Sequence, residues 1–494
     1  MGICRCHCTP KCKKWTTFGF AIAFILLGLF FSVFWTMIFD KILKFELSIY
    51  STNSVSYQMW KETPIPIYIS FYLFNWTNSE EVIKNSTIKP IFVECGPYTY
   101  YEHHVRDNVT FNDNGTVSFY TRRTWKYLPE KSVGDLTDKI TTFNPILATV
   151  GDLIKYKHVI VQLGVNFFLE EKRVQLAITK TVDEYIFKGY DDPLLDLVRK
   201  LNITAFQIPY GKFGWFVNRN DSAEYDGFYN MIDGADGINN LGIIKNWNYQ
   251  SRLPYYEGEC GIVNGSQGEL WYPPHDQQRI KIFSSDLCSS LDLDRSEEFT
   301  QFGLKGYKYV GTERNFDNGT NYLESRCFIS KDFVGEQYSG VRNVSLCKFR
   351  APALVSYPHF YLADPSYLEN IEGLKPDKEK HEMYLSLQPD TGLPLSVRAK
   401  IQINLKMERL KHIKLLSNVQ TRVMPSFWFS QQVDLTENLA TPVKTLLVLP
   451  SAGQYTGFSL LGLGAVIAII GFTVTYRRGW HDSEEEQLLD QNAI

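Results

Sequence analysis

The chain has 494 residues, and its 51 basic and 54 acidic side chains give a formal charge of −3. Acidic and basic residues are interspersed, which excludes a protein that binds nucleic acid through a basic surface. A middle segment of about 400 residues is long enough to bury a large core, as one domain or two.

The first predicted element is a membrane-spanning helix over residues 15–39. This stretch holds no charged residue, and as a helix it would span about 37 Å, enough to cross a hydrocarbon core of about 30 Å. Trp15 and Trp35 lie near its ends, where amphipathic rings favour the membrane interface. A cleaved signal peptide is the alternative, but the run is long and Phe39–Lys41 does not resemble a cleavage site.

The N-terminal tail, residues 1–14, is rich in cysteine. Beside a membrane helix we expect these thiols to be palmitoylated. A zinc site is an alternative, although the spacing C-x-C-x-C is tighter than the usual C-x2-4-C pair of zinc ligands. Unmodified free thiols are another alternative. Gly2 does not meet the myristoylation motif, because Cys6 stands where Ser or Thr is needed. The four candidate sites are Cys4, Cys6, Cys8 and Cys12.

The segment 40–454 is predicted to lie outside the cell or in a lumen, and it begins with strand signals. A helix over 44–60 precedes a β-branched and aromatic run at 64–74, whose prolines stand at its start. Asn114-Gly115 between alternating apolar residues predicts a hairpin with a two-residue turn. Residues 64–130 therefore read as an antiparallel meander, in which we expect His103 and His104 to be solvated.

The pattern becomes helical over residues 144–201. Asn144 can cap a helix that starts at Pro145, and a second helix is predicted over 159–176. Thr181 to Glu184 fits a capping box, and Gly189 fits a helix stop. Asp192-Pro193 begins one more short helix.

Residues 210–348 are rich in strand and turn signals and hold four of the five cysteines of the middle segment. Four cysteines allow three pairings, and spacing alone does not choose among them. These four are Cys260, Cys288, Cys327 and Cys347, and the fifth is Cys95.

The strongest predicted strand is 395–408, where apolar and polar residues alternate strictly. Period two over fourteen residues predicts one apolar face and one wet face, and such a long strand suits a barrel wall. The apolar face either packs a core or lines a lipid cavity. Its members considered for a cavity wall are Leu395, Val397, Ile401 and Ile403.

A second membrane helix is predicted over 455–476, followed by a tail at 477–494. Basic residues before the first run and Arg477-Arg478 after the second place both tails in the cytosol by the positive-inside rule. Nine Asn-x-Ser/Thr sequons fall between the two runs, as expected for an exported segment. They are Asn75, Asn85, Asn108, Asn114, Asn202, Asn220, Asn264, Asn318 and Asn343.

Motifs of common enzymes and metal sites are missing from the sequence. It has no nucleophile elbow or phosphate-binding loop, and His381-Glu382 lacks the second histidine of a zinc motif, since Leu385 stands in its place. We therefore expect a protein that is not an enzyme and has no cofactor, catalytic residue or metal site.

Several motifs in a fixed order resemble the class B scavenger receptor family of the fatty-acid translocase, croquemort and lysosomal integral membrane protein type. The resemblance extends over nearly the whole middle segment. Its motifs are 96–100 (GPYTY), 189–193 (GYDDP), 283–288 (FSSDLC), 358–361 (PHFY) and the run from His381 through Pro389 and Gly392 into the long strand.

The resemblance implies an α+β membrane protein with two terminal transmembrane helices around a large ectodomain. That ectodomain would be an irregular antiparallel β-barrel with a lipid tunnel and an apical helical bundle at 144–201. It also implies disulfides Cys260–Cys327 and Cys288–Cys347, with Cys95 unpaired; Ile329 stands where many members have another cysteine. Ligand recognition at the apex would then involve Phe167, Phe168, Lys172 and Arg173. The alternative interpretation is that these residues form a solvated helix face of mixed charge.

Two functions follow as expectations from the resemblance. The first is a plasma-membrane receptor that binds lipoproteins or apoptotic cells and moves lipid (fatty acid, sterol, carotenoid or phospholipid) into the bilayer. The second is a lysosomal or endosomal protein that exports lipid or sorts a hydrolase. A homo-oligomer and a clathrin-adaptor contact are further expected partners. The adaptor contact would use Glu484 with Leu488 and Leu489, which fit an acidic dileucine signal, unless the tail is merely solvated and acidic.

Overall fold

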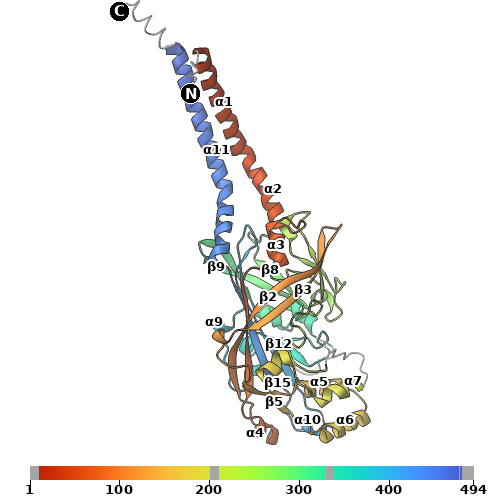
Figure 1. The fold of residues 1–494 in the computed structure, drawn as a ribbon. Coiled ribbons are helices and arrows are strands. Elements are labelled where there is room, and N and C mark those ends of the chain that lie inside the picture. Colours follow the sequence, from red (N-terminus) through yellow and green to blue (C-terminus); the bar gives the residue numbers. More distant parts are fainter. Residues whose placement is uncertain (1–9, 201–210, 330–337, 349, 478, 481–494) are drawn as a thin grey trace, which may run out of the picture. The chain divides into compact units, whose positions relative to one another are not determined.

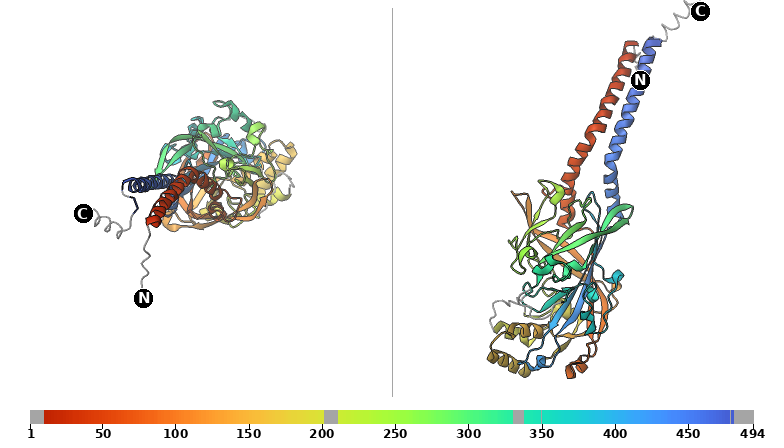
Figure 2. Two further views of the ribbon diagram at one scale, coloured as in Figure 1. Left: turned by 90° about the horizontal axis from the view of Figure 1, so that it is seen from above. Right: turned by 180° about the vertical axis from the view of Figure 1, so that it is seen from behind.

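The computed structural model describes residues 10–200, 211–329, 338–348, 350–477 and 479–480. The chain divides into two compact units. The terminal unit comprises the chain up to Glu46 and from Glu437 onward, and the central unit is Leu47–Thr436. Figures 1 and 2 show that the terminal unit is helical, whereas the central unit is built on a large sheet with short helices at one end.

The terminal unit holds two long apolar helical stretches. The first consists of α1 (Pro10–Leu29), a π-helical turn η1 (Phe30–Phe34) and α2 (Trp35–Leu47), and the second is α11 (Glu437–Arg477). Cys12–Leu47 and Glu437–Arg477 are long and apolar enough to cross a bilayer. Both helical stretches extend beyond the predicted spans 15–39 and 455–476, whose exact boundaries stay predictions. The chain is thus a membrane protein.

Glycines of α11 let it approach the first helical stretch closely at η1 and α2. A Cβ at Gly457 would lie 2.6 Å from the amide nitrogen of Ser32, and one at Gly453 would overlap the ring of Trp35. The indole Nε1 of Trp35 donates to the carbonyl of Leu449 at 3.0 Å. Small residues that bring backbones together are the usual basis of helix pairing in lipid.

Among its described residues, the central unit contains a thirteen-stranded antiparallel sheet and a separate two-stranded one, β4–β5. The main path runs β7-β6-β3-β2-β1-β15-β14-β13-β10-β9-β8, with β12 on β14 and β11 on β12. The strands are β1 (Ile67–Trp76), β2 (Phe92–Asn112), β3 (Thr116–Tyr127), β4 (Lys139–Phe143), β5 (Ala177–Thr181), β6 (Phe228–Ile232), β7 (Ile244–Trp247), β8 (Arg279–Ser284), β9 (Ser289–Gln301), β10 (Leu304–Gly311), β11 (Arg342–Asn343), β12 (Ala353–Ser356), β13 (Tyr384–Leu387), β14 (Pro394–Met407) and β15 (Arg422–Asp434).

The two ends of this path meet across a short connection. Ser266 bridges Ile243, just before β7, on one side and Ile282 of β8 on the other. We call this connection the barrel seam. It makes the sheet a nearly closed barrel, so the antiparallel barrel expected from the resemblance is confirmed.

The hairpin between β2 and β3 differs from its prediction. Asn112 lies opposite Thr116, so the loop has three residues, 113–115, rather than the two expected. Gly115 closes it with φ +68°. A three-residue loop that ends in a left-handed glycine is the next commonest hairpin connection after the two-residue turns.

The helical segment contains α5 (Pro145–Ile154), α6 (Val159–Glu171), the π-helical turn η3 (Glu184–Lys188) and α7 (Pro193–Lys200). Asn144 caps α5 by accepting from two amides, as predicted. α6 ends five residues earlier than expected, because the chain turns at Arg173 (φ +52°) and enters β5, which the sequence did not predict. The capping box forms, with Thr181 and Glu184 bonded reciprocally.

The remaining helices are short. The α-helices are α3 (Val55–Lys61), α4 (Ser79–Lys84), α8 (Ser366–Glu369), α9 (Lys378–His381) and α10 (Lys414–Ser417). The 3-10 turns are η2 (Pro129–Lys131), η4 (Ile238–Asn240), η5 (Gly258–Gly261), η6 (Glu313–Phe316), η7 (Leu323–Phe328) and η8 (Pro358–Phe360).

The long strand β14 forms as predicted, but the prediction that its polar face is wet is wrong. Gln402 and Asn404 are fully buried, and Lys400 is nearly so. The chain from η8 to α9 covers this face: Gln402 Oε1 accepts from the amide of His359 at 2.6 Å, and Lys400 Nζ donates to the carbonyl of Lys380 at 2.7 Å. The polar residues are thus bonded to a second layer instead of to water.

Candidate functional site

The predicted ligand-binding residues lie at the end of α6 but do not share one face. Phe167 is 71% exposed, whereas Phe168 packs against the main hydrophobic core. Lys172 lies 3.2 Å from the carboxylate of Glu171 and 5.9 Å from the ring of Phe168. Phe167 therefore contributes to an exposed surface, and Phe168 holds the helix to the fold.

An apolar stripe on α6, which sequence reasoning did not identify apart from Phe167, is the main feature of this surface. Ile160 is 73% exposed, Leu163 52% and Phe167 71%, at helical spacing on one face. Tyr156, just before the helix, is also exposed. Exposed apolar side chains gathered in this way mark an interaction site. The signal was available in the sequence, because residues 159–169 are apolar nearly all round and a surface helix cannot bury every side.

The charged residues around the stripe are largely paired. Lys414 lies 3.6 Å from Glu170, and Lys172 pairs with Glu171. Exposed pairs of this kind contribute about 0–1 kcal/mol, whereas burying one large apolar side chain contributes about 1.5–3 kcal/mol. Contact through the stripe would therefore outweigh attraction to a cationic patch.

Aromatic rings fill the barrel interior next to α5–α7. Phe71 of β1 has no exposed surface, and its ring centroid lies 5.0 Å from that of Phe216 and 6.0 Å from that of Phe187. Tyr100, Phe427 and Phe429 surround it at 5.8–6.3 Å. We call this group, with Trp125, the aromatic plug.

Two polar atoms inside the aromatic plug lack a hydrogen bond. Tyr100 Oη and Trp125 Nε1 are buried and find no partner among the described residues. Burial also raises the pKa of Tyr100, so its hydroxyl stays protonated. The plug therefore offers unsatisfied hydrogen-bonding groups to any molecule that enters it.

Next to the plug, charged side chains form a buried ion network. His104 contacts Glu102 through Nε2 and Glu269 through Nδ1, each at 2.6 Å. Arg106 lies 2.7 Å from Glu269, and Gln431 donates to Glu102 at 2.8 Å. Because both ring nitrogens of His104 face carboxylates, both donate, and the ring is the charged imidazolium.

The network continues through Arg123 of β3 into residues of neighbouring turns and loops. Arg123 contacts Asp226 at 2.9 Å, and Arg219 lies between Asp226 (2.7 Å) and Asp286 (3.2 Å). Lys348 contacts Asp286 at 3.8 Å. In all, five cationic groups and four carboxylates are joined inside the central unit: Arg106, Arg123, Arg219, Lys348 and His104 with Glu102, Glu269, Asp226 and Asp286.

The pKa values in this network follow from pairing. Burial raises the pKa of the Glu102 carboxyl, but the charges of His104 and Arg123 outweigh it and lower that pKa to about 2. Burial lowers the pKa of His104, but Glu269 and Glu102 raise it above its ordinary value. The prediction that His103 and His104 are both solvated is wrong for His104, because alternate strand residues face opposite sides.

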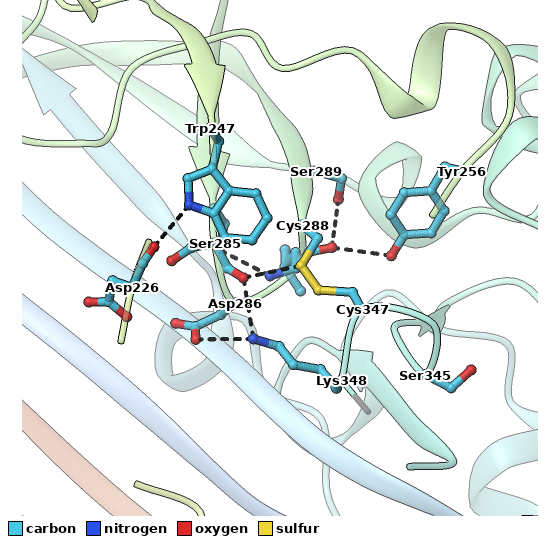
Figure 3. Close-up of a disulfide and its surroundings, with 12 residues drawn as sticks. Asp226, Trp247, Tyr256, Ser285, Asp286, Cys288, Ser289, Ser345, Cys347 and Lys348 are labelled. Atoms are coloured by element: carbon cyan, nitrogen blue, oxygen red, sulfur yellow. Dashed lines mark hydrogen bonds and ion pairs between the residues drawn. A yellow bond between two sulfur atoms is a disulfide. The ribbon is translucent and has the colours of Figure 1, made fainter. Parts of the chain in front are cut away.

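A disulfide holds one end of the network in place (Figure 3). Cys288 and Cys347 are bonded, with Cα atoms 6.3 Å apart. Lys348 follows Cys347 directly, and its Nζ points to Asp286 and to the carbonyl of Ser285, which accepts at 3.2 Å. The other disulfide joins Cys260 to Cys327. These are the two pairs that the resemblance implied.

Two further cysteines, Cys95 and Cys12, differ in their exposure. Cys95 is a free thiol on β2 and is partly buried, while Cys12 is exposed on α1. The other three tail cysteines and the tail residues of the sorting motif lie outside the described residues.

The sequon asparagines share a bonding pattern. In seven of them, no hydrogen bond from the side-chain Nδ2, the atom that would carry a glycan, occurs within the described part of the chain. In most, Oδ1 accepts a bond instead, as in Asn220 from the amide of Trp125 at 2.9 Å. Asn202 lies outside the described residues. The seven are Asn75, Asn85, Asn108, Asn114, Asn220, Asn264 and Asn343.

Comparison with known proteins gives a consistent result. The model of the CD36 family matches residues 17–475. Protein peste of Drosophila melanogaster is 36% identical over 461 residues, 92% of this chain and 81% of its own. Scavenger receptor class B member 1 of Cricetulus griseus is 33% identical over 421 residues (85% and 81%), and human lysosome membrane protein 2 is 30% identical over 443 residues (89% and 89%).

Proposed function

This chain belongs to the CD36 family, and from that premise we propose that it is a receptor for lipids or lipid-bearing particles. In this proposal α6 binds the particle, and lipid then passes through the barrel interior to the bilayer in which α1–α2 and α11 are anchored. Both tails face the cytosol, and the central unit faces the outside or a lumen.

The observation that carries the proposal is the exposed stripe Ile160, Leu163 and Phe167. An amphipathic helix with such a stripe can insert its apolar side into the boundary between headgroups and acyl chains of a lipid surface. Lys172, the C-cap of α6, and Arg173, where the chain turns, can then approach anionic headgroups.

The barrel interior is the proposed route for the lipid after binding. The inward face of β14, with Leu395, Val397, Ile401 and Ile403, is the proposed wall of this route, and it continues into the aromatic plug through Phe429. Passage requires the plug to open, because its rings contact one another. A single lipid with a polar head would meet the free groups of Tyr100 and Trp125 there.

A lysosomal address is the second candidate, favoured by the similarity to human lysosome membrane protein 2. The acidic dileucine motif ending at Leu488-Leu489 is a proposed sorting signal for this address. The fold would serve both roles, so the address and the ligand decide between them.

Binding by cells that express the full chain tests the proposed role of the stripe. We expect Ile160→Ser combined with Phe167→Ser to weaken binding of phospholipid vesicles or lipoprotein particles at least tenfold, because two apolar side chains that would be buried on binding contribute about 1.5–3 kcal/mol each. Lys172→Ala combined with Arg173→Ala is the matched control on the same helix. We expect it to change binding less than threefold, about 0.65 kcal/mol. Equal loss in both variants, or no loss in the first, would remove α6 from the binding surface.

A further inference from the structure

A groove of about 450 Å³ lies on the central unit beside the barrel seam. This volume is in the range of small-molecule sites, about 300–1,000 Å³. Both apolar and polar side chains line it. The lining residues are Ile243, Ile244, Lys245, Asn246, Ser251, Arg252, Ile262, Val263 and Asn264.

At the barrel seam beside the groove, a few backbone hydrogen bonds join the two ends of the sheet. At the seam, the amide of Ile244 donates to the carbonyl of Gly265 at 2.9 Å, and Ser266 exchanges bonds with Lys281 and Phe283 of β8 at 2.9 and 2.8 Å. Two residues, rather than a strand, therefore join the edges of β7 and β8. Uncovered strand edges invite pairing with other chains, and proteins usually cover them.

Asn264 belongs to both the groove and a sequon, Asn264-Gly265-Ser266. Gly265 is required by the seam: its φ is +100°, and a Cβ there would lie 2.6 Å from the carbonyl oxygen of Lys281. Ser266 is fully buried and donates to the carbonyl of Leu270 at 2.7 Å. The fold thus explains Gly265 and Ser266 of the sequon, but it does not require an asparagine at position 264.

The side chain of Asn264 is oriented as attachment of a glycan requires. It is exposed, and its Oδ1 accepts from the amide of Gly265 at 2.8 Å. Its Nδ2 makes no hydrogen bond to the described residues. Asn246, which lines the same groove without being a sequon, uses its Nδ2 to donate to Asn230 at 3.3 Å.

We propose that the core of an N-linked glycan on Asn264 lies in this groove and covers the barrel seam. The apolar faces of the first sugar rings would pack on Ile243 and Ile262, and their hydroxyls would face Lys245 and Arg252 at the rim. The glycan would then be a fixed part of the barrel wall, unlike a glycan that projects into solvent. This inference rests on the proposed outward or lumenal orientation of the central unit, but not on the proposed binding of lipid.

The accessibility of the glycan to enzymes tests this inference. The full chain, expressed in secretory cells, is digested under native conditions with peptide-N-glycosidase F, and glycopeptides are followed by mass spectrometry. We expect release from Asn264 to be at least about tenfold slower than from exposed Asn85, which corresponds to about 1.4 kcal/mol. We also expect Asn264 to retain less processed, oligomannose-type chains, because processing enzymes meet the same obstacle.

A pair of tryptophan variants separates packing in the groove from other causes. Ser251→Trp fills the groove and leaves the sequon intact, so the glycan on Asn264 should become as accessible as that on Asn85. Gln250→Trp places the same ring one residue away, outside the lining, and should leave the protection unchanged. An unoccupied Asn264, or an Asn264 glycan released as fast as that of Asn85 in the unmodified chain, would overturn the proposal.

Discussion

The charge on His104 depends on the two carboxylates at its ring nitrogens, so removing one should cost stability. We predict that Glu102→Gln lowers the free energy of unfolding by about 3–5 kcal/mol, because loss of one member leaves buried charges without a partner. Thermal unfolding of the full chain in detergent measures this. Glu62→Gln is the control, since Glu62 pairs with His103 while 66% exposed, and such a pair contributes about 0–1 kcal/mol. Equal effects in the two variants would contradict the role of the network.

The same residues predict how stability depends on pH. Because the pKa of His104 is raised in the folded state, the charged His104 stabilises the fold at pH values below its ordinary pKa of 6.5. This contribution is lost as pH rises through the raised pKa. Because the pKa of Glu102 is lowered in the folded state, its carboxylate stabilises the fold at pH values above 4.5. This contribution is lost as pH falls toward about 2. Both contributions are present from pH 4.5 to 6.5. We predict that His104→Gln flattens the decline of the unfolding temperature above pH 6.5; an unchanged decline would refute this.

Local sequence signals predicted single residues well where the cause was local. Asn144 caps α5 and Thr181 pairs with Glu184, because the partners lie within three residues. The environment of His104 could not be predicted, because Glu269 comes from a segment 165 residues away. Likewise, nothing near Gln402 in sequence indicates that η8 covers it.

At the scale of elements, the aromatic plug must open for lipid to pass. Phe187 lies on the π-helical turn η3 and contacts Phe71, Tyr100 and Phe216. We predict that Phe187→Ala speeds transfer of a fluorescent sterol from bound particles to the cell membrane, because one ring of the barrier is gone. Phe283→Ala, in a separate core cluster, is the control for lost packing and should not speed transfer. Slower transfer in Phe187→Ala than in this control would contradict the proposed barrier.

Larger side chains on the inward face of β14 should slow lipid transfer instead of speeding it. We predict that Ile401→Trp or Ile403→Trp reduces lipid uptake while leaving particle binding nearly intact, because the larger ring narrows the proposed route. Uptake and binding are measured on the same cells with a double-labelled particle. Equal loss of both would indicate misfolding, and unchanged uptake would exclude this strand from the wall of the route.

Elements were predictable from periodicity, and their surroundings were not. Alternation over 395–408 predicted β14 almost to the residue, and apolar runs predicted α1–α2 and α11. The alternation of polar and apolar residues does not reveal what covers each face of a strand. The polar face of β14 was therefore predicted, wrongly, to be exposed to water. In α6 the sequence likewise did not show which of the apolar side chains are covered and which stay exposed.

At the scale of the whole molecule, the proposed sorting signal lies in the C-terminal tail. We predict that Leu488→Ala with Leu489→Ala raises the surface level several-fold, because the proposed signal would place these two leucines in an apolar pocket of an adaptor. Surface biotinylation against total protein measures the ratio. Glu485→Ala is the matched control, since it lies outside the acidic dileucine pattern. An unchanged ratio for the double variant would favour a resident plasma-membrane receptor.

The most direct test of lipid passage through the barrel is photolabelling of the full chain in cells. A diazirine-bearing fatty acid and a diazirine-bearing sterol are supplied in particles, activated by light and mapped by mass spectrometry. The proposal predicts labels inside the barrel, on the inward residues of β1, β14 and β15 around Phe71, Ile401 and Phe429, and fewer of them in Ile401→Trp. Labels confined to α6, α1 and α11, with none inside the barrel, would contradict it.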